Sequence, residues 1–189
     1  HSNDARGVTI TIDPKTSAPA DRVAPLVRTT GHEFGVRSQP LTGFTALFNG
    51  RDTTGWHFSR TVHHGSVGKA SVEESAIVLR QEPFGQGGLF LTDKRYRDFE
   101  LYAEFWADTT TNSGIFIRGT NPNKIGTDTA YEVNIFDQRP GPEYATGAIV
   151  GVGSVPAGAY KAGGKWNTYE IYAKGPTMVI KFNGQVTVH

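Results

Sequence analysis

The sequence predicts an all-β protein, an antiparallel two-sheet β-sandwich of the jelly-roll type. Short segments with alternating apolar and polar residues recur between turn signals, which is typical of half-buried strands. Among the 189 residues, 23 are Gly and 11% are aromatic, a composition that favours strands and turns over helices. No segment shows an amphipathic pattern of three helical turns. Many short strands joined by turns are typical of a sandwich or jelly roll.

Each strand is predicted from its own segment, in chain order. The expected strands are 45–48, 71–73, 76–80, 88–92, 99–106, 114–118, 131–136, 147–151, 166–173, 177–182 and 185–188. The clearest alternation is in 99–106 (FELYAEFW) and in 166–173 (WNTYEIYA). Asn183-Gly184 predicts a two-residue hairpin turn, because both turn positions need positive φ.

The domain organisation is predicted to be uneven. Residues 1–42 are expected to form an irregular N-terminal arm or linker, in which 8–12 (VTITI) could form one short strand. The sandwich domain is expected over 43–189. The chain opens at His1-Ser2 rather than Met, so we expect a processed or trimmed product, with His1 a candidate tag remnant.

Composition and missing motifs exclude several function classes. The net charge is +1 and no basic stripe is present, so nucleic acid is not an expected partner. No apolar run approaches the ~20 residues of a membrane span. The absence of Cys excludes disulfides, thiol catalysis and Cys-ligated zinc. There is no P-loop, no G-x-S-x-G and no dinucleotide-binding motif, so no organic cofactor is expected.

One polar strand face is the strongest candidate site. Alternation puts Glu132, Asn134 and Phe136 on one face of their strand, and Phe116 and Arg118 on one face of another. An acid, an amide, an arginine and exposed rings are groups that bind sugars. Arg118 needs a partner in a sheet face, and Glu132 is the expected one. An ordinary solvated face is the alternative.

Further candidates lie outside this face. His63-His64, in RTVHHGS, could act as general acid and base or as metal ligands, or could lie in a solvated loop. His57 carries a weaker signal. Asp137 is expected to bind its own loop or a metal. Trp166 is by default a core residue and alternatively a sugar-stacking one. Asn112 lies in a predicted turn, Asn112-Ser113-Gly114.

The carboxylates do not form the pair of an ordinary glycosidase. Glu132 and Asp137 are five positions apart and have opposite strand parity, so they are not a same-face pair. Glu100 and Glu104 share their strand face with Tyr102 and Trp106. The E-x-D-x-x-E triplet of jelly-roll glucanases is absent.

Several runs together resemble the 3-keto-disaccharide hydrolase domain family over about residues 43–188. They are FTALFNGRDTTGW (44–56), SRTVHHG (59–65), GGLFLTDKRYRDFELYAEF (87–105), NSGIFIRG (112–119), AYEVNIFD (130–137) and GKWNTYEIYAKGPTMVIKFNGQVTV (164–188). The resemblance implies the two-sheet sandwich of concanavalin A-like lectins and glucanases. The family continues past the Asn-Gly hairpin, so the last strand or strands are expected to be missing here.

The resemblance also implies a reaction and a location. The substrate would be a 3-keto-glycoside, cleaved by removal of the C2 proton, elimination and hydration. Glu132 or His64 would be the base, His63 the acid, and Arg118, with or without a divalent cation such as Ca²⁺, would stabilise the enediolate. Asn112, Phe116, Asn134, Phe136 and Trp166 would contact the sugar. A secreted, periplasmic or cell-surface location is implied.

Two alternatives to an enzyme stay open. One is a non-catalytic, lectin-like carbohydrate-binding module that stacks sugars on Phe116, Phe136 and a Trp, with a structural Ca²⁺. The other is a structural or interaction module of a cell-surface protein. The sequence does not indicate an oligomeric state.

Overall fold

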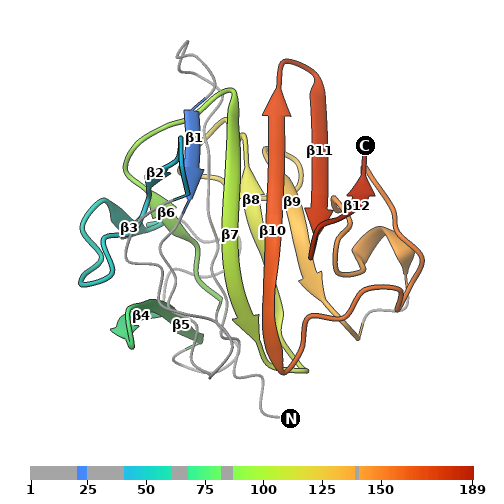
Figure 1. The fold of residues 1–189 in the computed structure, drawn as a ribbon, viewed down its shortest axis with the longest axis horizontal. Helices are drawn as coiled ribbons and strands as arrows, with labels where there is room; N and C mark the ends of the chain where they lie inside the picture. Colours follow the sequence, from blue (N-terminus) through green and yellow to red (C-terminus); the bar gives the residue numbers. More distant parts are fainter. Residues whose placement is uncertain (1–20, 25–40, 61–67, 82–86, 139–140) are drawn as a thin grey trace.

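The computed structural model describes residues 21–24, 41–60, 68–81, 87–138 and 141–189 as a two-layered, nearly all-β fold. Figure 1 shows a large sheet with a second layer, which includes β8 and β9, behind it. The regular helical structure in the described residues is one 3₁₀ turn, η1 (Pro142–Tyr144). The predicted all-β sandwich is confirmed.

The large sheet has six strands in the order β12-β11-β10-β7-β1-β2. Their bounds are β1 Asp21–Ala24, β2 Thr45–Ala46, β7 Phe99–Ala107, β10 Lys165–Lys174, β11 Thr177–Phe182 and β12 Gln185–Val188. β7, β10, β11 and β12 pair antiparallel, whereas β1 pairs parallel with both β2 and β7. β1 was not expected from the sequence; the expected strand at 8–12 lies outside the described residues.

The remaining strands form two-stranded pairs. They are β3 (Trp56–Phe58) with β6 (Phe90–Thr92), β4 (Gly68–Glu73) with β5 (Ala76–Gln81), and β8 (Asn112–Ile117) with β9 (Tyr131–Phe136). All three pairs are antiparallel. β3 was not expected, because a three-residue strand between turns is too short to show alternation.

The core lies between the two layers. Leu101 and Phe105 of β7 and Ile171 of β10 pack in one cluster with Ile115 and Val133 of the β8–β9 pair. β7 alternates strictly between buried and half-buried residues, as a strand with one face on a core must.

A buried tyrosine joins the layers. The Tyr169 hydroxyl donates to the Asn134 carbonyl at 2.5 Å and accepts from the Gly147 amide at 2.9 Å. Burial raises the pKa of Tyr169 far above its usual range, so the phenol stays neutral.

The L-F-N-G-x-D-x-x-G-W run makes a turn that delivers Trp56 to the core. The Asn49 side-chain oxygen accepts from the amides of Arg51 and Asp52, at 2.8 and 3.0 Å. Hydrogen bonds from Thr54, and then from Asn49, lower the pKa of Asp52 to about 2. Trp56 is buried and donates its indole N–H to the Leu47 carbonyl at 2.8 Å. The Asn, Asp and Trp of this motif therefore each have a structural role.

Two hairpin turns use positive φ in different ways. Asn183 and Gly184 have φ of 49° and 79°, which confirms the predicted turn between β11 and β12. The turn between β4 and β5 places the non-glycine residues Glu74 and Ser75 at φ of 49° and 61°. The second turn therefore carries backbone strain that the first avoids.

The strand expected at 147–151 is wrong. Gly147 and Gly151 both have positive φ, which breaks an extended run, and only Ile149 forms isolated bridges, to Val133 and Gly153. Ala148 and Ile149 are nevertheless fully buried. The apolar pattern of 147–151 therefore indicates buried residues, although the backbone there is not an extended strand. In the described part of the chain, no helix is long and apolar enough to cross a membrane.

Candidate functional site

The β8–β9 pair places most residues of the predicted polar face side by side. Asn112 pairs with Phe136, Gly114 with Asn134, and Phe116 with Glu132. Directly opposed residues of an antiparallel pair point to the same side. The predicted turn at Asn112-Ser113-Gly114 is wrong, because these residues begin β8.

This face is not the open sugar platform that alternation alone suggests. Phe116 is 3% exposed and packs in a second cluster with Leu89, Leu91, Ile125 and Ala130. The expectation of an exposed Phe116 is therefore wrong.

Asn134 is also covered. It is 3% exposed, and its side-chain amide donates to the Tyr144 carbonyl at 2.5 Å. Glu132 and Phe136 are half-buried and Asn112 is exposed, so these three are the members that solvent reaches. The accessible part of the predicted face is thus reduced to one acid, one ring and one amide.

Glu132 lies over Gly114 on the neighbouring strand. A Cβ at Gly114 would come within 2.9 Å of both Cγ and Oε1 of Glu132. Such an approach is closer than real Cβ contacts, so any larger residue at 114 would displace the acid. The glycine of the N-S-G run therefore sets the position of Glu132.

Arg118 does not pair with Glu132, so that expectation is wrong. Its guanidinium contacts Asp98 at 3.2 Å and donates to the Arg97 and Gly175 carbonyls. Asp98 also accepts from the Gly175 amide at 3.0 Å. A positive φ of 54° at Arg118 turns the chain away from the strand parity that predicted the pair. Arg118 instead ties the end of β8 to the turn between β10 and β11.

Asp137 binds loops through every part of its carboxylate. Oδ1 accepts from the Thr146 hydroxyl at 2.7 Å and from the Ala162 amide at 3.0 Å. Oδ2 accepts from the Ala162 amide at 3.0 Å and from the Gly163 amide at 2.8 Å. The predicted loop binding is confirmed. This donor set does not suit a cation, because the amide and hydroxyl hydrogens point at the oxygens that would bind it.

The other predicted residues are elsewhere. Trp166 is half-buried on β10, in the large sheet, directly opposite Trp106 of β7. His63 and His64 lie outside the described residues. Among the residues that are described, no three His, Asp or Glu side chains gather as metal ligands would.

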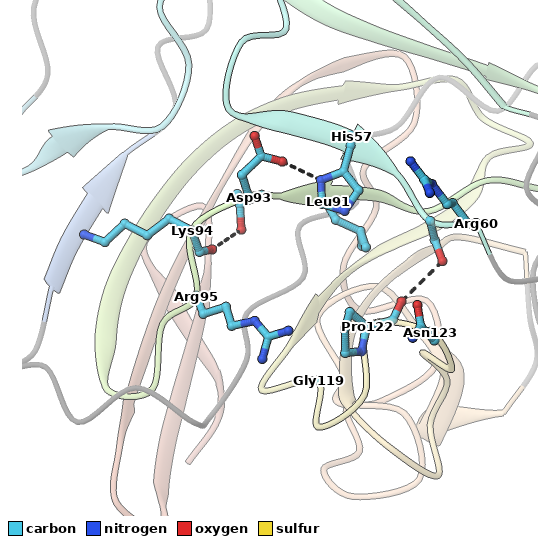
Figure 2. Close-up of a pocket in the computed structure, with 11 residues that line it drawn as sticks. His57, Arg60, Leu91, Asp93, Lys94, Arg95, Gly119, Pro122 and Asn123 are labelled. Atoms are coloured by element: carbon cyan, nitrogen blue, oxygen red, sulfur yellow. Dashed lines mark hydrogen bonds and ion pairs between the residues drawn. The ribbon is translucent and has the colours of Figure 1, made fainter.

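A pocket of about 370 Å³ lies beside the β3–β6 pair, and Figure 2 shows its lining. The β6 side and the loop after it supply Leu91, Asp93, Lys94 and Arg95; the β3 side supplies His57, Ser59 and Arg60; a third loop supplies Gly119, Pro122 and Asn123. The buried Ser59 hydroxyl donates to the Pro122 carbonyl at 3.4 Å, joining the β3 side to the third loop.

The pocket contains a histidine–aspartate pair. His57 Nδ1 and Asp93 Oδ1 are 2.5 Å apart. The pair forms because His57 opposes Leu91 on β6, and Asp93 lies two residues further along the same side. An aspartate on Nδ1 holds the imidazole in one orientation and leaves Nε2 as the proton-accepting atom.

Three cationic residues, all exposed, line the same pocket as this pair. Arg60, Lys94 and Arg95 line the pocket and exceed the one carboxylate of Asp93 in charge. Figure 2 shows Arg95 directed toward the space below His57 and Leu91, with Arg60 on the side of His57 away from Asp93. A base in such a pocket can remove a proton, and nearby cations can stabilise the anion that results.

The pocket and the β8–β9 face both adjoin the second hydrophobic cluster. Leu91 lines the pocket and packs in the same cluster as Phe116, whose cross-strand partner is Glu132. His57 carries only a weak signal in the sequence, and Asp93, Arg60 and Arg95 carry none. The pairing of β3 with β6, over 36 positions, is what brings His57 and Asp93 together.

Comparison with known proteins adds a family. Residues 43–189 match the family described as the 3-keto-alpha-glucoside-1,2-lyase-like domain. No protein of curated function matches.

Two crystal structures of proteins from Parabacteroides distasonis, each provisionally named a glycosyl hydrolase, are similar. One has a TM-score of 0.60 and 20% sequence identity. The matched region covers 76% of this chain and 70% of the other protein, and this likeness shows the fold. The other has a TM-score of 0.47 at 29% identity and covers 51% of this chain. This chain spans 52% of that second protein.

Proposed function

Because this chain belongs to the 3-keto-alpha-glucoside-1,2-lyase-like domain family, we propose that it cleaves glycosides whose C3 hydroxyl has been oxidised to a ketone. The ketone acidifies the hydrogen on C2. Removal of that proton gives an enediolate; the C1–O bond then breaks as the aglycone oxygen takes a proton. Water adds to C1 of the enone, so the net reaction is hydrolysis. No pair of opposed carboxylates is needed, in contrast to ordinary glycosidases.

The pocket beside β3 and β6 contains candidates for two of the groups that this route needs, the base and the cations that stabilise the enediolate. His57, oriented by Asp93, is the proposed base at Nε2. Arg60 and Arg95 are the proposed partners of the enediolate oxygens, in place of Arg118, whose guanidinium is engaged with Asp98. The 2.5 Å contact between His57 and Asp93 in a cationic pocket is the observation that carries the proposal.

Several expectations from the sequence remain as proposals. Glu132 is the competing base. It is half-buried, and its cross-strand partner Phe116 packs in the same cluster as Leu91, which lines the pocket. His63 is the proposed acid for the leaving group and His64 a second base candidate; both follow Arg60 closely in the sequence. A divalent cation is a proposed addition that a chelator tests. Family membership also supports a secreted, periplasmic or cell-surface location.

The test compares 4-nitrophenyl 3-keto-glucoside with its unoxidised parent, with and without a chelator. We expect release of nitrophenol from the keto form alone, and a primary isotope effect when deuterium replaces hydrogen at C2. His57→Gln should lower kcat by about 100-fold or more, because general-base catalysis contributes about that much. His189→Gln, at an exposed histidine away from the pocket, is the matched control.

Other outcomes would contradict parts of the proposal. Loss of activity in Glu132→Gln with full activity in His57→Gln would make Glu132 the base. Equal cleavage of the parent glucoside would exclude elimination through the C3 ketone. Binding of the keto-glucoside without release would favour the lectin-like alternative.

A further inference from the structure

A row of aromatic side chains lies on the outer face of the large sheet, on the side away from the core. The alternating burial of β7 and β10 directs Tyr102 and Trp106 outward on one strand, and Trp166 and Tyr172 outward on the other. Trp106 pairs directly with Trp166, and Tyr102 with Glu170. The half-buried rings thus form two groups on this face, the Trp106–Trp166 pair and the tyrosines Tyr102 and Tyr172, with Glu104, Thr168 and Glu170 between them.

The tyrosines at one end of this row, Tyr102 and Tyr172, line a groove. Its volume is about 630 Å³, within the range of ligand sites. Its lining includes Phe44, Glu100, Tyr102, Glu170, Tyr172 and Lys181. With a strand rise of about 3.4 Å per residue, Tyr102 and Trp106 are about 14 Å apart, so the row extends beyond the groove. Its length suits an elongated ligand better than a single ring.

The polar groups of the row limit the chemistry of that ligand. Glu100, Glu104 and Glu170 carry three negative charges on this face against the two positive charges of Lys174 and Lys181, and Lys181 lies 3.3 Å from Glu170. The Tyr102 hydroxyl donates to Glu104 at 3.0 Å, which fixes an acceptor beside a ring. Negative charge repels anionic partners, while carboxylates accept hydrogen bonds from hydroxyl groups. Flat apolar rings beside hydroxyl acceptors match the two kinds of surface that a sugar presents.

We propose that this face binds a neutral oligosaccharide chain, at a site separate from the His57–Asp93 pocket. The pocket is built from β3, β6 and the 119–123 loop, whereas this surface is built from β7, β10 and β11 with Leu41 and Phe44, and the two share no lining residue. The inference goes beyond the proposed reaction, because binding here needs no turnover.

The test measures binding of cellohexaose, xylohexaose and maltohexaose to the whole chain by calorimetry, with a heparin hexasaccharide as the anionic probe. At least one neutral hexasaccharide should bind. Trp166→Ala and Tyr172→Ala should each weaken its Kd at least tenfold, while Trp166→Phe should stay within about threefold. Val152→Ser, at an exposed apolar residue outside the row, is the control and should not change it.

Catalysis separates this inference from the proposed function. The kcat/KM on 4-nitrophenyl 3-keto-glucoside should be unchanged in folded Tyr172→Ala. Failure of every neutral hexasaccharide to bind, tighter binding of heparin, or unchanged binding in both alanine variants would overturn the inference. So would loss of activity alongside binding, since the two sites would then be one. Wild-type protein that binds a neutral hexasaccharide but does not cleave the 3-keto-glucoside would contradict only the proposed reaction.

Discussion

Asp137 shows how one residue holds several loops at the end of β9. Its carboxylate accepts from the Thr146 hydroxyl and from the amides of Ala162 and Gly163. A Cβ at Gly163 would lie 2.6 Å from the Thr109 Cα, so the loop approaches closely and only glycine fits. The acid and the glycine therefore act together as one structural junction.

Asp137→Ala should lower the free energy of unfolding by about 2–4 kcal/mol, because it leaves amides and a hydroxyl without their charged acceptor. Asp137→Asn should cost less, since the amide oxygen still accepts. Urea denaturation measures both. Asp128→Ala is the control: that exposed acid pairs with Lys124, and its loss should cost less than about 0.5 kcal/mol. An equal loss of unfolding free energy in Asp137→Ala and Asp128→Ala would contradict the structural role of Asp137.

Arg118 illustrates the limit of strand parity at the residue scale. Parity places it beside Phe116 and toward Glu132, but the positive φ at the strand end redirects it to Asp98. A single backbone dihedral therefore explains why the observed partner of Arg118 differs from the predicted one.

At the element scale, the turn between β4 and β5 is poorly matched to its residues. Glu74 and Ser75 both hold positive φ, which Asn and Gly adopt at much lower cost. The turn between β11 and β12 has that pair at Asn183-Gly184 and shows the preferred solution.

Replacing Glu74-Ser75 by Asn-Gly should raise the free energy of unfolding by about 1 kcal/mol, because the strain at two positions is relieved. Thermal and urea unfolding would measure the gain. Glu74→Gln with Ser75→Ala removes the same side-chain groups without favouring positive φ and should give no gain. A gain in this control would assign the effect to side chains.

At the scale of the whole molecule, β1 links the N-terminal part of the chain to the large sheet. It pairs parallel with β7 at 21–23 and with β2 at 23–24, and it stands between them. Figure 1 shows it beside β7 in the large sheet, whose edge on this side is β2. The family match begins only at residue 43.

A chain beginning at residue 25 should lose about 2 kcal/mol of unfolding free energy relative to one beginning at residue 21. The shorter chain lacks the β1 ladder, and β2 and β7 lose their shared neighbour. Hydrogen exchange of the β7 amides should rise in the shorter chain alone. Identical stability of the two chains would show that the β1 pairing contributes nothing.

The sequence by itself determined the longer strands and which of their residues face the core. Alternation in 99–106, 131–136 and 166–173 places the inward residues correctly, because a strand with one buried face imposes a period of two on its own residues. The turn at Asn183-Gly184 follows equally from local backbone chemistry. Such features depend on neighbours in the chain, so the sequence suffices for them.

Tertiary structure decided what covers each face and which polar groups meet. Phe116 and Asn134 lie on the predicted face but are buried by residues outside their own strands, Leu89 and Ile125 at Phe116 and Tyr144 at Asn134, which the alternation within a strand does not report. His57 and Asp93 meet only because β3 pairs with β6 in one register. Burial and long-range pairing depend on how distant elements pack, so the candidate site became visible only in the folded chain.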